Sequence, residues 1–389
     1  MPITFLHTAD WQLGKPYQRV RDDSKRFRLQ HERIECLGRI AAAAKEHGAS
    51  FVVVAGDLFD SPRPTKATVS AACGAVGAMG VPVLVIPGNH DYGGPGSLWE
   101  QEFFLREQQQ LAPNLRVLLS PEPVVLADAV IFPTPLMRRQ EMADPTAWIR
   151  SAFDAPAFPT DLPRIVLAHG TIQGFGSAQD DEDESPVAAN LIDLTRLPVA
   201  EIDYIALGDW HGTKQVGPNA WYCGTPEIDR FPKGTQNEPG HILKVTLGRG
   251  QNPQVEILKT GRFRWNDVTF RFSEDTSLDA FSAMLDEKIG NQGMDSLLLL
   301  ALDGSLGIEA SERLETLLEA LESRLLRLKL THQVAIAPTP EEIDALTLRA
   351  EDPLVAAVAG KLVALSDGGD AEIARLALRE LHSACAGTR

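Results

Sequence analysis

The first two thirds of the sequence alternate short β-branched runs with longer amphipathic stretches, and this alternation constrains the fold more than any other feature. Strands are predicted over residues 3–7 and 51–55, and a helix over residues 26–46 between them. A continuous apolar run such as residues 51–55 is typical of a strand buried on both faces. Strand–helix alternation that later gives way to strands alone predicts a layered α/β domain with antiparallel additions.

The remaining elements of this domain follow the same two periodicities. A second helix is predicted over residues 65–79. Further strands are predicted over residues 83–86, 124–130, 164–168, 204–207, 220–223, 242–247 and 255–258. The pattern breaks near Gly261, so the first domain is placed at residues 1–261.

A β-α-β-α-β order follows this break and predicts a small α+β domain at residues 262–339. Its strands and helices are expected over residues 268–272, 278–289, 297–302, 308–321 and 328–337. Pro340 followed by two glutamates is a typical helix start, and residues 340–389 form a helical segment. Its apolar stripe of Leu354, Val358, Leu362 and Leu365 either packs on its own domain or offers a partner surface, with equal weight on both interpretations.

Composition excludes several classes of protein. The 389 residues include 37 Lys and Arg against 53 Asp and Glu, which gives a net charge of −16 and argues against uniform coating of nucleic acid. The apolar fraction of 44% excludes a disordered chain. No secretory signal and no apolar run near the ~20 residues of a membrane span is visible. The four cysteines form no CxxC pair, so a cytoplasmic protein with reduced thiols is predicted. The acidic run Asp180–Glu184 is interpreted as a solvated loop, not as a metal site.

Five short polar motifs stand directly after five predicted strands, beginning near Asp10, Gly56, Gly88, His169 and Gly208. Loops beyond the carboxyl ends of strands form the ligand site of layered α/β proteins, so the motifs should converge at one edge of the sheet. Together they would bring seven donors to one place: Asp10, Gln12, Asp57, Asn89, His169, Asp209 and His211.

The chemistry of this donor set indicates two divalent ions. It contains carboxylate, amide and imidazole groups without a thiolate, which suits Mn²⁺, Mg²⁺ or iron better than a structural zinc. Seven donors exceed what one ion takes from a protein. Two ions about 3.5–4 Å apart, with Asp57 as the bridging carboxylate, satisfy the set.

These motifs resemble a known family. Asp10-Trp11-Gln12, Gly56-Asp57, Gly88-Asn89-His90-Asp91, His169-Gly170 and Gly208-Asp209-Trp210-His211 are similar to the motifs of calcineurin-like metallophosphoesterases. More narrowly, they resemble SbcD-type DNA repair exonucleases, the nuclease subunits of double-strand-break repair complexes. The stretch from Tyr222 to Glu227 adds to the likeness, which covers residues 1–260. The resemblance implies a metallophosphoesterase β-sandwich flanked by helices, followed by a smaller α+β capping domain and C-terminal helices.

The resemblance also implies roles for the site residues. The first metal ion would be held by Asp10, Gln12, Asp57 and His211, and the second by Asp57, Asn89, His169 and Asp209. His90 would face the scissile phosphate as general acid or transition-state stabiliser, oriented by Asp91. The family usually has histidine at positions 12 and 209, and the oxygen donors found here favour Mn²⁺ or Mg²⁺.

A basic stretch follows the first metal motif and is a candidate surface for the DNA backbone. Its members are Lys15, Tyr17, Arg19, Arg21, Lys25 and Arg26, and the rings of Tyr17 and Phe27 are expected to stack on bases. An ordinary solvated helix start explains the same charges equally well.

The leading hypothesis is a two-metal phosphodiesterase that cleaves DNA, as a Mn²⁺-dependent exonuclease with some endonuclease activity on single strands. The alternatives are a small-molecule or nucleotide phosphoesterase of the same superfamily, and a non-catalytic subunit that binds DNA or a partner. The resemblance further implies an SMC-like ATPase partner of the SbcC type that docks on residues 341–389, and a homodimer formed through the phosphoesterase domain.

Overall fold

The computed structural model describes residues 2–154, 156–173, 189–228, 230–231, 237–290 and 292–386. The chain divides into two compact units, Met1–Phe263 and Arg264–Arg389. The division lies close to the domain boundary expected after residue 261, and the helical segment 340–389 lies in the same unit as the second-domain strands. The acidic run Asp180–Glu184 lies outside the described residues.

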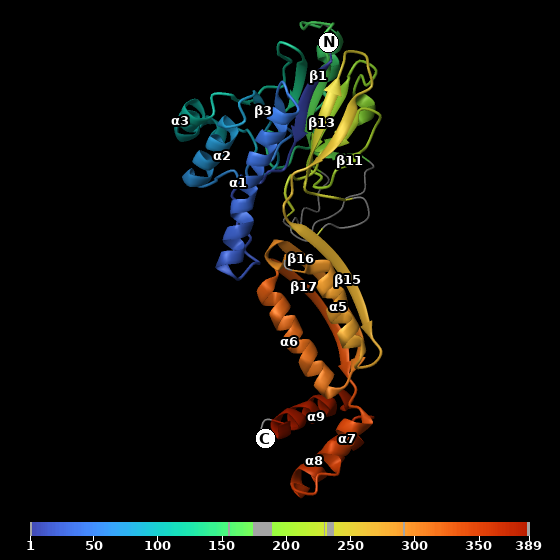
Figure 1. Cartoon of the computed structure of the whole chain (residues 1–389). Coiled ribbons are helices and arrows are strands. Elements are labelled where there is room, and N and C mark those ends of the chain that lie inside the picture. The colour runs from blue at the N-terminus through green and yellow to red at the C-terminus, as the bar shows by residue number, and fades with distance from the viewer. Residues whose placement is uncertain are drawn as a thin grey trace. The chain divides into compact units, whose positions relative to one another are not determined.

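The first unit contains two six-stranded mixed sheets (Figure 1). The first has the order β14-β13-β1-β2-β3-β4. Its parallel strands are β1 (Ile3–Thr8), β2 (Val52–Val54), β3 (Val83–Val85) and β4 (Leu115–Val117). Its antiparallel additions are β13 (His241–Leu247) and β14 (Gln254–Lys259).

The second sheet has the order β11-β12-β10-β7-β6-β5. Its parallel strands are β6 (Val130–Thr134), β7 (Arg164–His169), β10 (Tyr204–Gly208) and β12 (Ala220–Tyr222). The antiparallel edges are β5 (Val124–Val125) and β11 (Lys214–Gln215). A separate short pair is formed by β8 (Thr171–Ile172) and β9 (Leu191–Ile192).

The two sheets pack face to face because successive side chains of a strand point to opposite faces. Phe5 and Val53 of the first sheet share one buried cluster with Ile165, Leu167 and Tyr204 of the second. Their neighbours in sequence point outward and are covered by helices. The layered sandwich expected from the sequence is confirmed.

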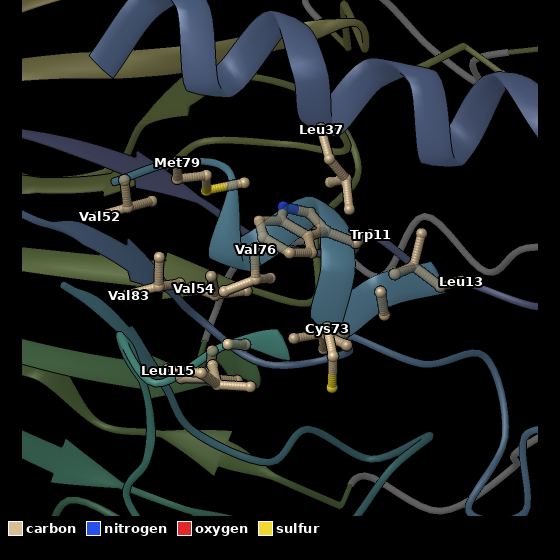
Figure 2. Close-up of a cluster of buried hydrophobic side chains, with 14 of the residues drawn as sticks. Trp11, Leu13, Leu37, Val52, Val54, Cys73, Val76, Met79, Val83 and Leu115 are labelled. Carbon is tan, nitrogen blue, oxygen red and sulfur yellow. The ribbon is translucent and has the colours of Figure 1, made fainter. Parts of the chain in front are cut away.

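Helices cover the outer face of each sheet. On the first sheet they are α1 (Asp23–Glu46), α2 (Lys66–Gly77), α3 (Glu102–Leu111) and the short η1 (Leu98–Glu100). Figure 2 shows the cluster beneath α1 and α2, in which Trp11, Leu37 and Val76 meet Val52 and Val54. On the second sheet the covering elements are α4 (Trp148–Asp154) and η2 (Leu194–Arg196). The elements α3, β4 and α4 were not predicted from the sequence.

One predicted strand is wrong. Residues 124–130 were expected to be continuous, but β5 ends at Val125, and β6 begins at Val130 and runs to Thr134. The amide of Leu126 donates to the carbonyl of Ala129, which closes a turn between the two strands. The apolar residues on both sides of this turn concealed it in the sequence.

His7 of β1 is a buried neutral histidine in the core between the sheets. Its Nε2 lies 3.2 Å from the carbonyl oxygen of Leu207, and its Nδ1 lies 3.0 Å from the hydroxyl of Tyr204. Because a carbonyl only accepts, Nε2 donates and Nδ1 accepts from Tyr204. Burial lowers the pKa of His7 from 6.5 to about 3.

This histidine makes the fold sensitive to acid. Below pH 6.5 the unfolded chain binds a proton on this imidazole, whereas the folded chain does not until about pH 3. The free energy of unfolding should therefore fall by up to about 1.4 kcal/mol per pH unit through this window as the pH decreases. Urea unfolding over a series of pH values should give a shallower slope for His7→Gln than for the wild type. His31→Gln, at an exposed histidine of α1, should keep the wild-type slope. An unchanged slope in His7→Gln would contradict the assignment.

Hydrogen bonds to Glu227 hold the end of the first unit in place. The side chain of Glu227 is 1% exposed. Its carboxylate accepts the backbone N–H groups of Ile228, Arg262 and Phe263 at 2.9–3.1 Å. It also accepts Arg39 Nη2 of α1 at 2.6 Å. Buried charges are stable in a fold only when they are paired in this way. Arg262 and Phe263, the last residues of the first unit, are therefore linked to α1 through Glu227.

The second unit contains a three-stranded parallel sheet, β15-β16-β17. Its elements are β15 (Arg264–Phe272), α5 (Ser277–Ile289), η3 (Gly293–Asp295), β16 (Ser296–Leu306), α6 (Ile308–Arg324) and β17 (Arg327–Ile336). The helices α5 and α6 share one buried cluster with the sheet. The predicted β-α-β-α-β order is confirmed.

Three further helices complete this unit: α7 (Pro340–Thr347), α8 (Pro353–Leu365) and α9 (Ala371–Ala386). Thr339 caps α7 in a reciprocal capping box with Glu342. Ala359 of α8 packs with Ile308, Leu346 and Leu378. Of the stripe predicted in α8, Leu362 joins this cluster, whereas Leu354, Val358 and Leu365 are exposed. The packed face is thus displaced from the predicted stripe. Within the part of the chain described, no helix has the length and apolarity needed to cross a membrane.

Candidate metal centre

The five motifs converge from both sheets of the sandwich. Three of them follow β1, β2 and β3 of the first sheet, and two follow β7 and β10 of the second. The motifs were expected at one edge of a single sheet, and this expectation is wrong because their strands belong to two sheets. The carboxyl ends of parallel strands in two packed sheets meet at one end of the sandwich, so the ligand-bearing loops still come together.

A buried group of two aspartates and a histidine forms the centre of the site. One carboxylate oxygen of Asp10, one of Asp57 and one ring nitrogen of His169 all lie within 4.8 Å of one another. His169 Nε2 lies 3.6 Å from Asp57 Oδ1, 3.8 Å from Asp209 Oδ1 and 2.9 Å from Asn89 Oδ1. Asp57, Asn89, His169 and Asp209 are the four side chains that the family resemblance assigns to one ion. Asp10, which lies beside them, is assigned to the other ion.

The other predicted ligands, Gln12 and His211, lie close to Asp10. His211 Nε2 lies 4.0 Å from Asp10 Oδ1 and 3.4 Å from Gln12 Nε2. Two cationic side chains bond to Gln12 and His211. Lys15 Nζ donates to Gln12 Oε1 at 3.1 Å, and a guanidinium nitrogen of Arg230 bonds to His211 Nδ1. All seven predicted ligands therefore lie in one connected group.

Strained backbone holds four of these residues in place. The φ angles are +52° at Asp10, +42° at Gln12, +54° at Asp57 and +101° at Asp209. Left-handed backbone costs a non-glycine residue on the order of 1–3 kcal/mol and concentrates at functional sites. Main-chain bonds between neighbouring motifs offset this cost: Asp10 N–H donates to Gly56 O at 3.1 Å, and Gln12 N–H to Asp57 O at 2.9 Å.

Three glycines leave room for the ligands. A Cβ at Gly56 would lie 2.2 Å from His169 Nδ1, and a Cβ at Gly88 would lie 2.1 Å from Asp57 Oδ1. At Gly208 it would lie 1.9 Å from the carbonyl oxygen of Ala55. The glycines of three motifs thus serve close packing of the ligands themselves.

The orientation of His169 presents one nitrogen to the site. Its Nδ1 lies 2.8 Å from the Ala55 carbonyl oxygen, so Nδ1 carries a proton and Nε2 faces the carboxylates. Thr171 orients Asp209 in the same way, by donating to Oδ2 at 2.7 Å. Backbone or hydroxyl bonds to the outer atoms of ligands are typical of metal sites.

The electrostatics of the site suit a divalent cation. Burial, reinforced by Asp57 and Asp209, raises the pKa of Asp10 to about 8. Burial alone would lower the pKa of His169, but Asp57, Asp10 and Asp209 outweigh it and raise this pKa to about 9. Without a bound ion, protons on Asp10 and His169 balance the negative charge of the buried carboxylates. A divalent ion would balance it instead, so the residues fit such an ion.

The hydrogen bonds of His90 and Asp91, the second half of the Gly88-Asn89-His90-Asp91 motif, differ from those expected. His90 Nδ1 lies 2.8 Å from the carbonyl oxygen of Asp60, and both carboxylate oxygens of Asp91 accept backbone N–H groups, from Gly88 at 2.8 Å and Phe59 at 3.0 Å. The expectation that Asp91 orients the His90 ring is therefore corrected. The main-chain carbonyl of Asp60 sets the orientation of the His90 ring. Asp91 holds the loop in place by accepting the backbone N–H groups of Gly88 and Phe59.

His90 lies at the edge of the carboxylate group. Its Nε2 is 3.9 Å from Asp57 Oδ2, its backbone N–H donates to Asp57 Oδ1 at 3.0 Å, and its side chain is 20% exposed. Since Nδ1 donates to a carbonyl, Nε2 is the nitrogen that can exchange a proton with a bound molecule. This arrangement fits a proton donor or acceptor that stands beside the ligands and is not one of them.

The basic stretch after the first motif is only partly available to DNA. Arg19 and Arg21 are exposed, whereas Lys15 bonds to Gln12 in the site. Tyr17 is 7% exposed and accepts a hydrogen bond from Arg33 at 2.6 Å, so its ring is not presented for stacking as expected. The other predicted members, Lys25 and Arg26, are half-buried, and Arg26 pairs with Asp23. Phe27 is 65% exposed and keeps an accessible ring.

The chain is similar to several known proteins. The family model of calcineurin-like phosphoesterases matches residues 3–213. The SbcD subunit of the nuclease SbcCD from Escherichia coli (strain K12) is 24% identical over 282 residues, which cover 66% of this chain and 68% of that protein, and the protein of the same name from Escherichia coli O157:H7 gives the same values. A crystal structure of TT1561 of Thermus thermophilus has a TM-score of 0.40 at 14% identity and covers 67% of this chain and 100% of that chain.

The family match spans more than half of the chain and includes all five strands that carry the motifs, from β1 to β10. It also includes each of the seven predicted ligands, the last of which is His211. Membership implies a metal-dependent phosphoester hydrolase. From its motifs, its fold and this match, the chain belongs to the calcineurin-like phosphoesterase family.

Proposed function

We propose that this chain is a two-metal phosphodiesterase that cleaves DNA in DNA repair, as an exonuclease that also cuts single strands internally. The observation that carries the proposal is the convergence of three aspartates, two histidines and two amide side chains from both sheets, with His90 Nε2 3.9 Å from Asp57. The name of the Escherichia coli relatives, which are subunits of the nuclease SbcCD, favours a nucleic acid over small phosphodiesters as the substrate.

Two divalent ions, Mn²⁺ or Mg²⁺, would be held by Asp10, Gln12, Asp57 and His211 on one side and by Asp57, Asn89, His169 and Asp209 on the other. When bound, such ions lower the pKa of water and stabilise charge on phosphoryl oxygens. The chain itself supplies a proton through His90. Because the Asp60 carbonyl holds Nδ1–H, a proton given to the leaving oxygen comes from Nε2 of the imidazolium.

Substrate approach would use the cations near the first motif. Arg19 and Arg21 are exposed on the segment between β1 and α1, and Phe27 offers a ring for base stacking. The net charge of −16 opposes tight binding of DNA by the whole chain. DNA engagement should therefore depend on this local surface and on the bound ions.

Two assembly proposals accompany the activity. The first is an SMC-like ATPase partner of the SbcC type, which would dock on the C-terminal helices, where Leu354, Leu365 and Ile373 expose 74%, 51% and 68% of their surface. The second is a homodimer formed through the phosphoesterase domain. Both follow from the likeness to the SbcD protein.

The test is cleavage of end-labelled duplex and single-stranded DNA by the purified full-length chain, with Mn²⁺ and with a chelator. We expect Mn²⁺-dependent release of short products from DNA. Hydrolysis of a nucleotide diester at a much higher kcat/KM than DNA would replace the proposal by a small-molecule phosphoesterase. DNA binding without cleavage of any phosphodiester would indicate a non-catalytic subunit.

A further inference from the structure

The segment between β6 and α4 is bonded to the loop that carries His90. The N–H of Leu136 donates to the carbonyl oxygen of Pro87 at 3.2 Å, and the carbonyl oxygen of Leu136 accepts the N–H of Gly93 at 2.8 Å. Pro87 and Gly93 stand on either side of the Gly88–Asp91 motif. The course of the segment is therefore fixed at Leu136 by the loop after β3.

A second link joins the same segment to the loop after β7. The side-chain amide of Asn190 accepts the N–H of Glu141 at Oδ1, at 2.7 Å, and donates from Nδ2 to the carbonyl oxygen of Arg139 at 3.1 Å. The carbonyl oxygen of Asn190 accepts the N–H of Thr171 at 3.0 Å. Thr171 is the residue whose hydroxyl orients the predicted ligand Asp209. Both ends of the segment 136–141 are thus bonded to loops that carry site residues.

The backbone of Asn190 is strained and the residue is buried. It is 7% exposed and has a φ angle of +56°. Left-handed backbone at a non-glycine residue is uncommon and concentrates at functional sites. The four residues between the two links, 137–140, are all exposed. A short exposed span that is fixed at both ends can present its side chains to a ligand with little further loss of conformational entropy.

The exposed span carries positive charge. It contains Arg138 and Arg139 and no acidic residue. Of the acidic residues that follow, Glu141 is half-buried, and the carboxylate of Asp144 accepts the N–H of Thr146 at 2.8 Å. Within the parts of the chain that the structure describes, Arg138 has no ion-pair partner. Its guanidinium is therefore available to an anion at the surface of the span that joins the two loops.

We propose that Arg138 binds a phosphate of the DNA strand that flanks the scissile phosphate, so that residues 137–140 form a phosphate subsite beside the metal centre. The planar guanidinium suits this role because it can donate two parallel hydrogen bonds to phosphate oxygens. A diester with a single phosphate cannot fill the metal centre and this subsite together. The inference rests on the proposed DNA cleavage and specifies how the site would prefer a polynucleotide to a small diester.

The first test is binding of a fluorescein-labelled single-stranded oligonucleotide, followed by fluorescence anisotropy. It uses the full-length chain with Mn²⁺ and the His90→Ala substitution, so that cleavage is slow during the measurement. Adding Arg138→Ala should raise the dissociation constant by roughly tenfold, as expected for the loss of one hydrogen-bonded contact to a charged group. The slope of log Kd against log salt concentration should become shallower by about 0.7, which corresponds to one phosphate of a single strand.

Two further variants separate this contact from the net charge of the chain. Arg138→Lys keeps the charge and should keep the salt slope. Arg116→Ala removes an exposed arginine of β4, whose following loop carries none of the seven predicted ligands, and should change neither quantity. A dissociation constant and slope that Arg138→Ala leaves unchanged would overturn the inference. Equal weakening by Arg138→Ala and Arg116→Ala would also overturn it, because net charge alone would then explain the effect.

The second test compares two substrates in the chain that retains His90. Arg138→Ala should raise the KM of a single-stranded oligonucleotide by roughly tenfold and leave kcat/KM for bis(p-nitrophenyl) phosphate, which has one phosphate, unchanged. An equal loss with both substrates would overturn the inference and leave the proposed function intact. A chain that cleaves neither substrate but binds the oligonucleotide through Arg138 would overturn the proposed cleavage and retain the subsite. A chain that cleaves the small diester and binds no oligonucleotide would overturn both.

Discussion

Replacing His90 by alanine should reduce the kcat of phosphodiester cleavage by about 10²–10⁴-fold, the usual contribution of a positioned proton donor or acceptor. The reason is geometric: its ring is held by the Asp60 carbonyl, and its Nε2 lies beside Asp57 without being one of the seven predicted ligands. Mn²⁺ binding measured by calorimetry should be unchanged in the variant, which separates this effect from loss of the metal centre.

His332→Ala provides the control for the histidine substitution, because His332 is exposed on β17, outside the site. It should retain wild-type kcat and metal binding. If His90→Ala keeps more than about a tenth of the wild-type kcat, a 10²-fold contribution is excluded, and His90 has no role in proton transfer. If it loses Mn²⁺ binding, His90 is a ligand, and the assignment of seven ligands is incomplete.

Asp57→Asn should abolish both activity and high-affinity metal binding. Asp57 is 3% exposed at its side chain, lies 3.6 Å from His169 and accepts the backbone N–H of His90. An amide of the same shape removes the charge and half of the ligand atoms. The loss of Mn²⁺ affinity should exceed the roughly 10–100-fold that follows removal of an outer partner of a metal ligand.

The matched control is Asp128→Asn, which makes the same chemical change at an exposed aspartate in the turn between β5 and β6. Its dissociation constants and kcat should equal those of the wild type. Two Mn²⁺ ions bound by Asp57→Asn with unchanged affinity would contradict the bridging role of Asp57. Circular dichroism of the variant checks that the buried amide is tolerated by the fold.

The sequence predicted the strands that carry the site because each is a continuous apolar run followed by a polar motif. β1, β7 and β10 begin and end within one residue of their predicted bounds. It did not reveal which sheet each strand joins, since periodicity records burial and contains no pairing information. The arrangement in two sheets therefore emerged only from the pairing of β7 with β6 and β10.

The failures at the site have a common physical cause. The partner of His90 is a backbone carbonyl, and main-chain groups are the same at every position of a sequence. Tyr17 is buried and its hydroxyl accepts a hydrogen bond from Arg33, which lies 16 residues further along the chain in α1. Lys15 counted as one positive charge among several, yet its hydrogen bond to Gln12 places it in the metal centre. Residue type indicated the candidate ligands, but the contacts that orient them come from tertiary structure.

The carboxylate of Glu227 has a mechanical consequence. It accepts the backbone amides of Arg262 and Phe263 and is itself paired with Arg39 of α1. A pulling force applied to the chain beyond Phe263 would therefore load several hydrogen bonds and an ion pair at once. Such a force would reach α1 through the Arg39 guanidinium.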